Sequence, residues 1–386
     1  MLAVEFGLVN WVVLSIYLSA TIFLGFALSR KVSSADDFFV GRKNIPWWAI
    51  GTSVVATYVS ALSFLGGPAW AYSEGLSVIA IHLNYPIVIF LVIAFFLPFF
   101  FNSGVASIYE YLERRFGPTS RSVISFIFLI SQSLTTSAVL YATALVIEFI
   151  TGIDVVYAIV IITLVALIYT VMGGIAAVIW TDVIQAFVLF IGAVIIVYAL
   201  INNLSLPLGE TLAILKSEGK TNALNFSFDP TQVSTVWSGV IAMTLFHITV
   251  YGANQMMVQR TLASKSIGDA KKSFLMMAYL AIFIYFLFFL LGILFYSYYG
   301  GREFDNSNTI ILEFASSLAI PGLMGIIAAS VIAASMSSLD SALNSMATVS
   351  TIDFYQKYIR SNATSTHYLN VSRLFTIFWA AVIIIP

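Results

Sequence analysis

The run Ala333-Ala334-Ser335-Met336-Ser337-Ser338-Leu339-Asp340-Ser341-Ala342-Leu343-Asn344-Ser345 lies inside an apolar span from about residue 321 to residue 352. A helix turns by about 100° per residue, so five residues of this run fall on one face: Ala334, Ser337, Ser338, Ser341 and Ser345. Asp340 lies at the edge of that face. Hydroxyl and carbonyl oxygens with a carboxylate nearby suit a hard, weakly held cation such as Na⁺. The run therefore predicts a helix with a cation-binding face.

Close helix packing is the alternative explanation for these serines, because small residues let membrane helices approach each other. Packing explains Ser335 or Ser345 equally well. It does not explain Asp340, since an ionisable group at bilayer depth costs at least about 2.5 kcal/mol and is by default a functional candidate.

The composition is that of a polytopic membrane protein, because the 386 residues are 60% hydrophobic and only 9% charged. The absence of cysteine excludes disulfides and thiolate chemistry. Three histidines and a net charge of −1 give no sign of a nucleic-acid partner. No nucleophile–base pair, metal-ligand cluster or phosphate-binding loop is found, so the chain is not expected to be an enzyme.

Apolar spans near or above the roughly 20 residues needed to cross a bilayer lie at 7–28, 45–72, 76–101, 121–150, 154–173, 181–202, 236–258, 272–299, 321–352 and 368–386. The first has neither a basic n-region nor a cleavage site, which predicts a retained helix. The last runs into Pro386 while still apolar, so we expect a C-terminally truncated sequence.

Two of these spans contain polar interruptions, at Thr57–Ser60 and at Tyr251–Gln255. They stand five spans apart and run in opposite directions. Paired broken helices in two inverted halves point to a transporter site near the bilayer midplane. Unwound backbone there exposes carbonyls and amides that can bind an ion or a polar solute.

The distribution of basic residues predicts the orientation. Of the 17 lysines and arginines, all but Lys216, Lys220 and Arg302 fall in alternate loops, beginning with Arg30 and Lys31. Basic loops stay in the cytoplasm. We therefore expect an external N-terminus and a multi-pass protein of the plasma membrane, in bacteria the inner membrane.

A second unusual stretch is Tyr169-Thr170-Val171-Met172-Gly173-Gly174-Ile175-Ala176-Ala177-Val178-Ile179-Trp180-Thr181-Asp182-Val183-Ile184-Gln185. The paired glycines predict a tight reversal between two spans. Asp182 then enters the next helix near its N-terminus, where the helix dipole favours a carboxylate by about 0.3–1 kcal/mol. Asp182 either caps that helix together with Thr181 or reaches the serine face and helps to hold a cation.

These features resemble the sodium:solute symporter family, which includes sodium/glucose, sialic acid, monocarboxylate and vitamin symporters. The matching segments are Tyr169–Gln185, Ser337–Ala347, Asp36–Arg42 and Gln259–Arg260. The resemblance implies an all-α, leucine-transporter-like fold of two inverted five-helix repeats preceded by one extra helix. The extra helix would be 7–28, the first repeat 45–202, and the second repeat 236–386 without its last core helix.

The resemblance also implies a sodium site, with Na⁺ as the bound ion. Its ligands would be the carbonyls of Ala56, Val59 and Ala334 and the hydroxyls of Ser337 and Ser338. A second sodium site would use Asp182, Ser337, Ser341 and Asp340. Asp340 departs from the family pattern, in which a small hydroxyl residue is usual. A second carboxylate would strengthen the site or make it sensitive to protons.

Solute-binding candidates lie on the broken helices and their neighbours. They are Tyr58, Ser60, Ser63, His82, Asn84, Gln132, Thr135, His247, Tyr251, Asn254 and Gln255. Each also fits a structural role, since serines close-pack, a core histidine can be satisfied internally and tyrosines fill volume.

Neither of two solute pockets known in this family, those for sialic acid and for glucose, is reproduced in this sequence. Sialic acid members use an arginine in the third core helix, where this chain has only Arg121 at one end. Glucose-type members use acidic and amide residues after the first break, where this chain has Leu62 and Ser63. We expect a sodium-coupled symporter of a sugar, a polyol or a small organic acid, working by alternating access with a monomer sufficient. The alternatives are the membrane sensor of a signalling protein and a sodium-independent uniporter.

Overall fold

The computed structural model describes residues 6–29, 32–105 and 107–385. Arg30, Lys31 and Pro386 lie outside the described residues. Within the described part the chain is helical and forms no β-strand, apart from a single bridge between Ile45 and Ser264. The expected all-α architecture is confirmed.

The first part of the chain follows the expected spans up to residue 202. The α-helices of these spans are α1 (Leu8–Ser29), α3 (Trp47–Tyr58), α4 (Ala61–Glu74), α5 (Tyr85–Leu91), α6 (Leu97–Ser103), α8 (Pro118–Thr151) and α9 (Val155–Asn202). The 3₁₀ segment η1 (Gly75–His82) leads into α5, and the π-helical turn η2 (Val92–Phe96) joins α5 to α6. The short helices α2 (Ala35–Val40) and α7 (Ile108–Phe116) lie between spans.

The second part begins after the short helix α10 (Leu208–Ser217) and an irregular stretch up to residue 235. Its elements are η3 (Ser238–Ala242), α11 (Met243–Ala253), α12 (Gln255–Leu262), α13 (Ile267–Tyr298), η4 (Ser307–Thr309), α14 (Ile310–Leu318), α15 (Leu323–Val349), η5 (Ser350–Ile359) and α16 (Ser365–Ile384). Both interrupted spans are broken where the polar residues predicted, between α3 and α4 and between α11 and α12.

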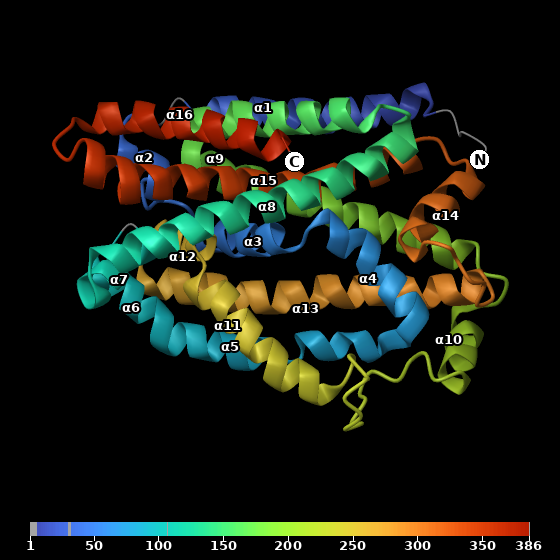
Figure 1. Cartoon of the computed structure of the whole chain (residues 1–386). Coiled ribbons are helices and arrows are strands. Elements are labelled where there is room, and N and C mark those ends of the chain that lie inside the picture. The colour runs from blue at the N-terminus through green and yellow to red at the C-terminus, as the bar shows by residue number, and fades with distance from the viewer. Residues whose placement is uncertain (1–5, 30–31, 106, 386) are drawn as a thin grey trace.

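Seven helical stretches in the described residues are long and apolar enough to cross a membrane. Ala61–Ser103 and Val155–Asn202, with 43 and 48 residues, exceed the roughly 20 residues of one crossing. The second contains two expected spans. The chain turns back inside it at Gly174, whose backbone has φ +53° and ψ −150° (Figure 1).

Gly174 is required by its surroundings as well as by its backbone. A Cβ atom there would lie 2.7 Å from the carbonyl oxygen of Phe38 in α2, and this φ/ψ region is open essentially to glycine alone. We expect Gly174→Ala to lower the free energy of unfolding by about 1–3 kcal/mol.

Gly152→Ala is the matched control, because Gly152 has φ +74° but nothing within 4 Å of its added Cβ. Thermal unfolding in detergent measures both variants. If both variants lost the same free energy of unfolding, the close contact between Gly174 and Phe38 would contribute nothing to the effect.

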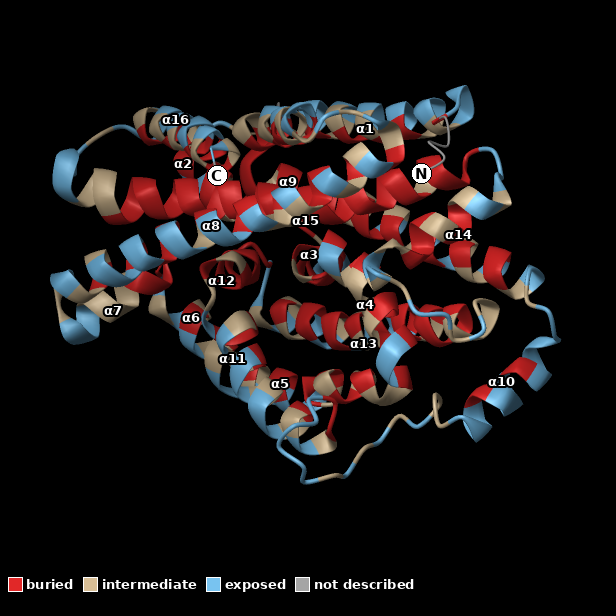
Figure 2. Cartoon of the chain, turned by 45° about the vertical axis from the view of Figure 1, so that its right-hand side comes forward, coloured by how far each residue is buried: buried red, intermediate tan, exposed pale blue. Residues whose placement is uncertain are grey.

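Helix α15 is the central element of the molecule. It packs against α9, α8, α1 and α16, and Figure 2 shows it buried along nearly its whole length. Its many alanines and serines allow this close approach, because small side chains bring helix backbones together in membranes. The serine face predicted from the sequence therefore lies in the middle of the protein.

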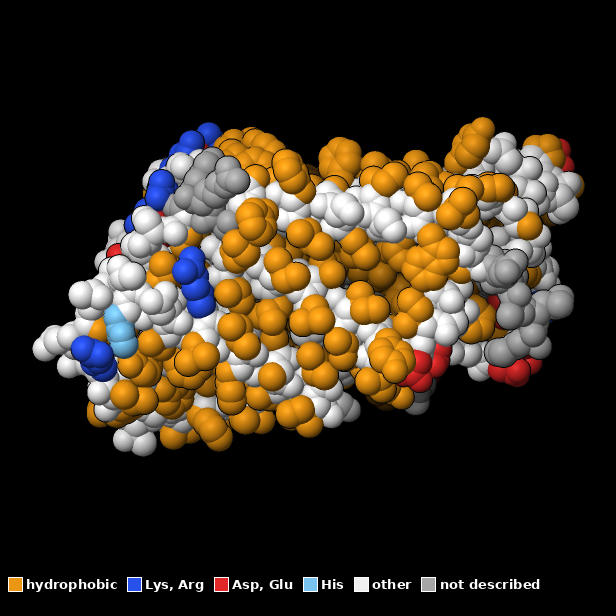
Figure 3. Space-filling view, turned by 90° about the horizontal axis from the view of Figure 1, so that it is seen from above, with side chains coloured by type: hydrophobic (Ala, Val, Ile, Leu, Met, Phe, Trp, Pro, Cys, Tyr) orange, Lys and Arg blue, Asp and Glu red, His pale blue; other side chains and the backbone are white. Residues whose placement is uncertain are grey.

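Charged and hydrophobic side chains occupy different parts of the outer surface. Figure 3 shows hydrophobic side chains over most of one face, with Lys and Arg gathered toward one end and acidic side chains mostly toward the other. An apolar middle between two charged ends is the pattern of a protein that crosses a lipid bilayer.

A charge cluster at the basic end joins three elements. The buried Arg121 of α8 contacts Asp353 of η5 at 2.6 Å and Glu113 of α7 at 2.7 Å. Lys357 contacts the other oxygen of Glu113 at 2.7 Å. Hydrogen bonds from Lys357 and Arg121 lower the pKa of the Glu113 carboxyl. The cluster ties the start of α8 to the end of the central helix.

Candidate functional site

Each of the two helix breaks places residues with extended backbone inside a membrane span. Val59 and Ser60 between α3 and α4 are extended, with ψ values of 96° and 173°. Asn254 between α11 and α12 is also extended, with φ −83° and ψ 133°. The Ser60 and Asn254 carbonyls accept amide hydrogen bonds from α4 and α12. The Ala56 and Thr57 carbonyls, just before the first break, accept from hydroxyls of α15 and are placed to bind an ion or solute instead.

A cavity of about 390 Å³ lies between the breaks and α8. Its lining comprises Thr57, Tyr58, Ser60, Ser131, Gln132, Thr135, Thr136, Val139, Val250, Asn254, Met256, Met257 and Ser338. The cavity brings together five of the predicted solute residues, which are Tyr58, Ser60, Gln132, Thr135 and Asn254. Its lining is mostly hydroxyl, amide and thioether groups, without a charged side chain.

The other solute candidates lie outside this lining. Ser63 and His82 face Tyr285, through a 3.4 Å hydroxyl contact and a ring stack at 3.7 Å respectively. The Tyr251 hydroxyl donates to that of Tyr85 at 3.5 Å. These three lie in an aromatic cluster outside the cavity lining.

His247 and Asn84 connect that cluster to the first break. The His247 ring contacts the Tyr58 hydroxyl at 3.0 Å and the Asn84 side chain at 2.8 Å. Gln255 lies apart from both groups, where its side-chain oxygen accepts a hydrogen bond from the Ile108 amide at 3.0 Å.

Ion-ligand candidates converge between α3 and α15. The Ser337 hydroxyl donates to the carbonyls of Ala56 at 2.8 Å and Ala334 at 3.1 Å. The Ser338 hydroxyl donates to the Thr57 carbonyl at 3.1 Å. A small cavity of about 10 Å³ is bounded by Ala56, Val59, Ala334 and Ser337, together with other residues of α3, α9 and α13. These hydroxyl and carbonyl oxygens are the donor type that Na⁺ takes.

Asp182 forms a fully buried ion pair with Arg260 of α12. Its carboxylate accepts from Arg260 at 2.9 Å and from the Ser53 hydroxyl at 2.5 Å, and both charged side chains have 0% exposure. The Arg260 guanidinium also donates to the hydroxyls of Ser53 and Ser341. The capping interpretation of Asp182 is wrong, because the residue lies inside α9 and its carboxylate bonds across to α3 and α12.

Arg260 was part of the family match, but its pairing with Asp182 was not predicted. The two residues are 78 positions apart, so no helical spacing joins them. The available signal was chemical, since an arginine within an apolar region needs a carboxylate or carbonyl partner.

Asp340 belongs to a neighbouring network. It accepts hydrogen bonds from the Tyr169 hydroxyl at 2.7 Å, the Thr181 hydroxyl at 3.3 Å and the Ser341 hydroxyl at 3.2 Å. Ser341 therefore connects Asp340 with Arg260 and Asp182. The network holds two buried carboxyl groups against one guanidinium, so Asp340 either keeps a proton or is balanced by a further cation.

Broken helices that enclose a solute-sized cavity, with candidate ion ligands in direct contact with it, are the arrangement of a membrane transporter. The chain belongs to the sodium:solute symporter family, whose sequence model matches residues 38–386. It is 32% identical to the sodium/sialic acid symporter SiaT of Proteus mirabilis, over 96% of this chain and 76% of that protein. It is also 32% identical to the sodium/glucose cotransporter of Vibrio parahaemolyticus, over 96% and 73%.

A solved structure extends this similarity to three dimensions. The substrate-bound, outward-open state of a Na⁺-coupled sialic acid symporter matches with a TM-score of 0.92 and 32% identity, over 98% of this chain and 82% of that one. The leucine-transporter-like fold is thereby confirmed. The chain is a sodium-coupled solute symporter rather than an enzyme.

Proposed function

We propose that this protein imports a small neutral, hydroxyl-rich solute together with Na⁺, by alternating access. The supporting observation is that Thr57 and Ser338 line the 390 Å³ cavity and also bond each other at the predicted sodium site. A cation that binds there engages Ser338, which also lines the solute cavity and donates to the Thr57 carbonyl beside it. Binding of one ligand is thus coupled to binding of the other.

The proposed coupling works through α3 and α15. Na⁺ would take the carbonyls of Ala56, Val59 and Ala334 and the hydroxyls of Ser337 and Ser338 as ligands. It would hold the first break in the shape that completes the solute cavity. Inward movement of each Na⁺ gains about 2.3 kcal/mol per 100 mV of membrane potential. A second Na⁺ at Asp182, Ser341 and Asp340 would double that contribution.

The orientation and assembly belong to the same proposal. The N-terminus lies outside and the basic end faces the cytoplasm of a plasma membrane, in bacteria the inner membrane. One copy contains the whole cavity, so a monomer suffices. The two inverted repeats would comprise 45–202 and 236–386, preceded by α1.

The cavity chemistry favours a neutral solute over a carboxylate. No lining residue is cationic, while hydroxyl and amide groups pair well with the hydroxyls of a sugar or polyol. Tyr58 offers a ring face for a sugar. A small organic acid held by hydrogen bonds alone is the alternative to a neutral solute.

Uptake into proteoliposomes tests the proposal. With an inward Na⁺ gradient, a panel of labelled sugars, polyols and small acids should contain a neutral solute that accumulates more than in choline. Thr135→Val should raise the KM for that solute about tenfold, the equivalent of one lost hydrogen bond of about 1.4 kcal/mol.

Thr143→Val is the matched control, since Thr143 is also on α8 but donates to its own helix at the Val139 carbonyl. Equal KM values for the two variants would remove Thr135 from the solute site. Equal uptake in sodium and choline would indicate a uniporter instead.

A further inference from the structure

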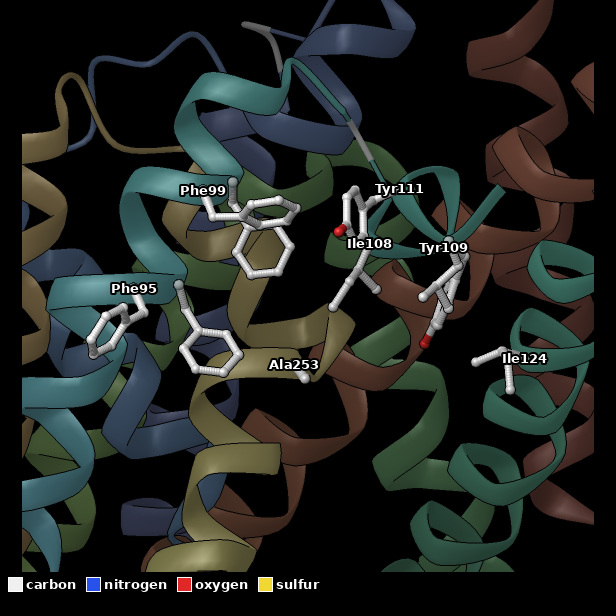
Figure 4. Close-up of a pocket in the computed structure, with 10 residues that line it drawn as sticks. Phe95, Phe99, Ile108, Tyr109, Tyr111, Ile124 and Ala253 are labelled. Atoms are coloured by element: carbon white, nitrogen blue, oxygen red, sulfur yellow. The ribbon is translucent and has the colours of Figure 1, made fainter. Parts of the chain in front are cut away.

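A second cavity lies on the outside of the helix bundle, close to the basic end. Its volume is about 470 Å³, within the range of ligand pockets. Figure 4 shows Phe95 and Phe99 on one side, Tyr109 and Ile124 on the other, and Ala253 between them. Phe95 is 64% exposed and Ile124 41% exposed, so this groove opens toward the surroundings of the protein.

The groove arises from a local departure from α-helical geometry. The π-helical turn η2 carries Phe95 and Phe96 immediately before α6, which has Pro98 in its first turn. A π turn changes the direction of the side chains that follow it, and such turns are frequent at functional sites. The wall on the other side comes from α7 and α8, so the groove is distinct from the solute cavity.

A cation stands at the mouth of the groove. Arg115, in the last turn of α7, donates to the hydroxyl of the lining residue Tyr111 at 3.2 Å. Its neighbour Arg114 is paired with Glu110 at 2.7 Å. Among the described residues, no carboxylate is paired with Arg115. An apolar groove with an unpaired guanidinium at its entrance matches a molecule that has a hydrocarbon chain and an anionic head.

We propose that this groove binds an anionic phospholipid, with one acyl chain between Phe95, Phe99 and Ile124 and the phosphate at Arg115. The bilayer supplies this ligand at the depth where the groove opens. Anionic lipids of the cytoplasmic leaflet are attracted to basic residues at the membrane surface. The groove lies at the basic end of the protein, on the side of that leaflet.

The lipid would also contact the helix that forms the solute cavity. Ala253 lines the groove, and the next residue, Asn254, lines the solute cavity. Gly252 packs so closely on η2 that a Cβ atom there would lie 2.9 Å from the Phe96 ring. An acyl chain in the groove therefore fills space directly behind the second helix break.

Native mass spectrometry of the purified chain, titrated with phosphatidylglycerol or phosphatidylcholine of the same acyl chains, tests the proposal without relying on transport. Wild-type protein should retain one phosphatidylglycerol about tenfold more strongly than phosphatidylcholine. Ile124→Trp, which fills the groove, should abolish retention of both lipids. Arg115→Gln should lower phosphatidylglycerol retention to the level of phosphatidylcholine.

Two matched controls keep the result specific. Ile127→Trp changes an exposed residue of α8 outside the groove lining, and Arg360→Gln removes another exposed arginine. Both should retain phosphatidylglycerol like the wild type. Equal retention by Ile124→Trp and Ile127→Trp would overturn the acyl-chain site. Displacement of the bound lipid by free glycerophosphate would show that the head group binds without the chain and would overturn the acyl-chain site. No effect of Arg115→Gln would overturn the assignment of the lipid phosphate to Arg115.

Discussion

Arg260→Gln is expected to lower the free energy of unfolding by about 3–5 kcal/mol, the usual cost of removing one partner from a buried ion pair. The variant leaves the Asp182 carboxylate without its cation in a site that has no exposure to solvent. It also removes charged hydrogen bonds to the hydroxyls of Ser53 and Ser341. Unfolding monitored by tryptophan fluorescence, in detergent with choline chloride, gives the measurement.

The double variant Asp182→Asn/Arg260→Gln separates charge from packing. It removes both charges together, so it should recover most of the loss that Arg260→Gln shows alone. Arg302→Gln is the matched surface control, because Arg302 pairs with Glu313 at 3.3 Å while both side chains are more than a third exposed. That variant should cost at most about 1 kcal/mol. An Arg260→Gln variant as stable as Arg302→Gln would show that the buried pair contributes little.

The expected spans corresponded closely to the helices because hydropathy records burial in lipid, and each crossing needs a long apolar run. The two breaks were also predictable. Residues such as Ser60 and Asn254 are rare in the middle of apolar helices, so their clustering marks places where the helix unwinds. Short helices such as α2, α7 and α14 were not predicted, since they are too short for a membrane-span pattern.

Pairings between distant helices were the part that the sequence could not provide. Arg121 meets Asp353 across 232 positions, and Arg260 meets Asp182 across 78. No periodicity relates such residues, and only the packed structure brings them together. The rotation of each helix about its axis was equally hidden, which is why Ser63 and His82 were grouped with Tyr58 although they face the aromatic cluster.

The serine face, by contrast, follows from one helix alone. Spacings of three and four residues fix Ser337, Ser338 and Ser341 on a common side whatever the tertiary fold. The structure shows the partners of that side. Ser337 and Ser338 contact backbone next to the first break, and Ser341 contacts Arg260. Asp340, at the edge of the face, turns instead toward Tyr169 of α9.

Sodium chloride is expected to stabilise the wild-type protein relative to choline chloride, and Ser337→Ala should remove this effect. A ligand at a hundred times its dissociation constant adds about 2.7 kcal/mol to the free energy of unfolding. Ser337 donates to the Ala56 and Ala334 carbonyls, so its hydroxyl lies among the oxygens that would surround the ion. Thermal unfolding in the two salts at equal ionic strength gives the measurement.

Ser335→Ala provides the matched control for this prediction. Ser335 is a buried serine of the same helix, and its hydroxyl has no hydrogen-bond partner among the described residues. Its loss should leave both the stability in choline and the response to sodium close to those of the wild type.

Asp182→Asn then tests the second ion, because a response reduced only in part would mean that two Na⁺ ions contribute. If Ser337→Ala kept the full sodium response that Ser335→Ala shows, the ion would bind elsewhere, since a five-oxygen site at the first break cannot lose a ligand without loss of affinity.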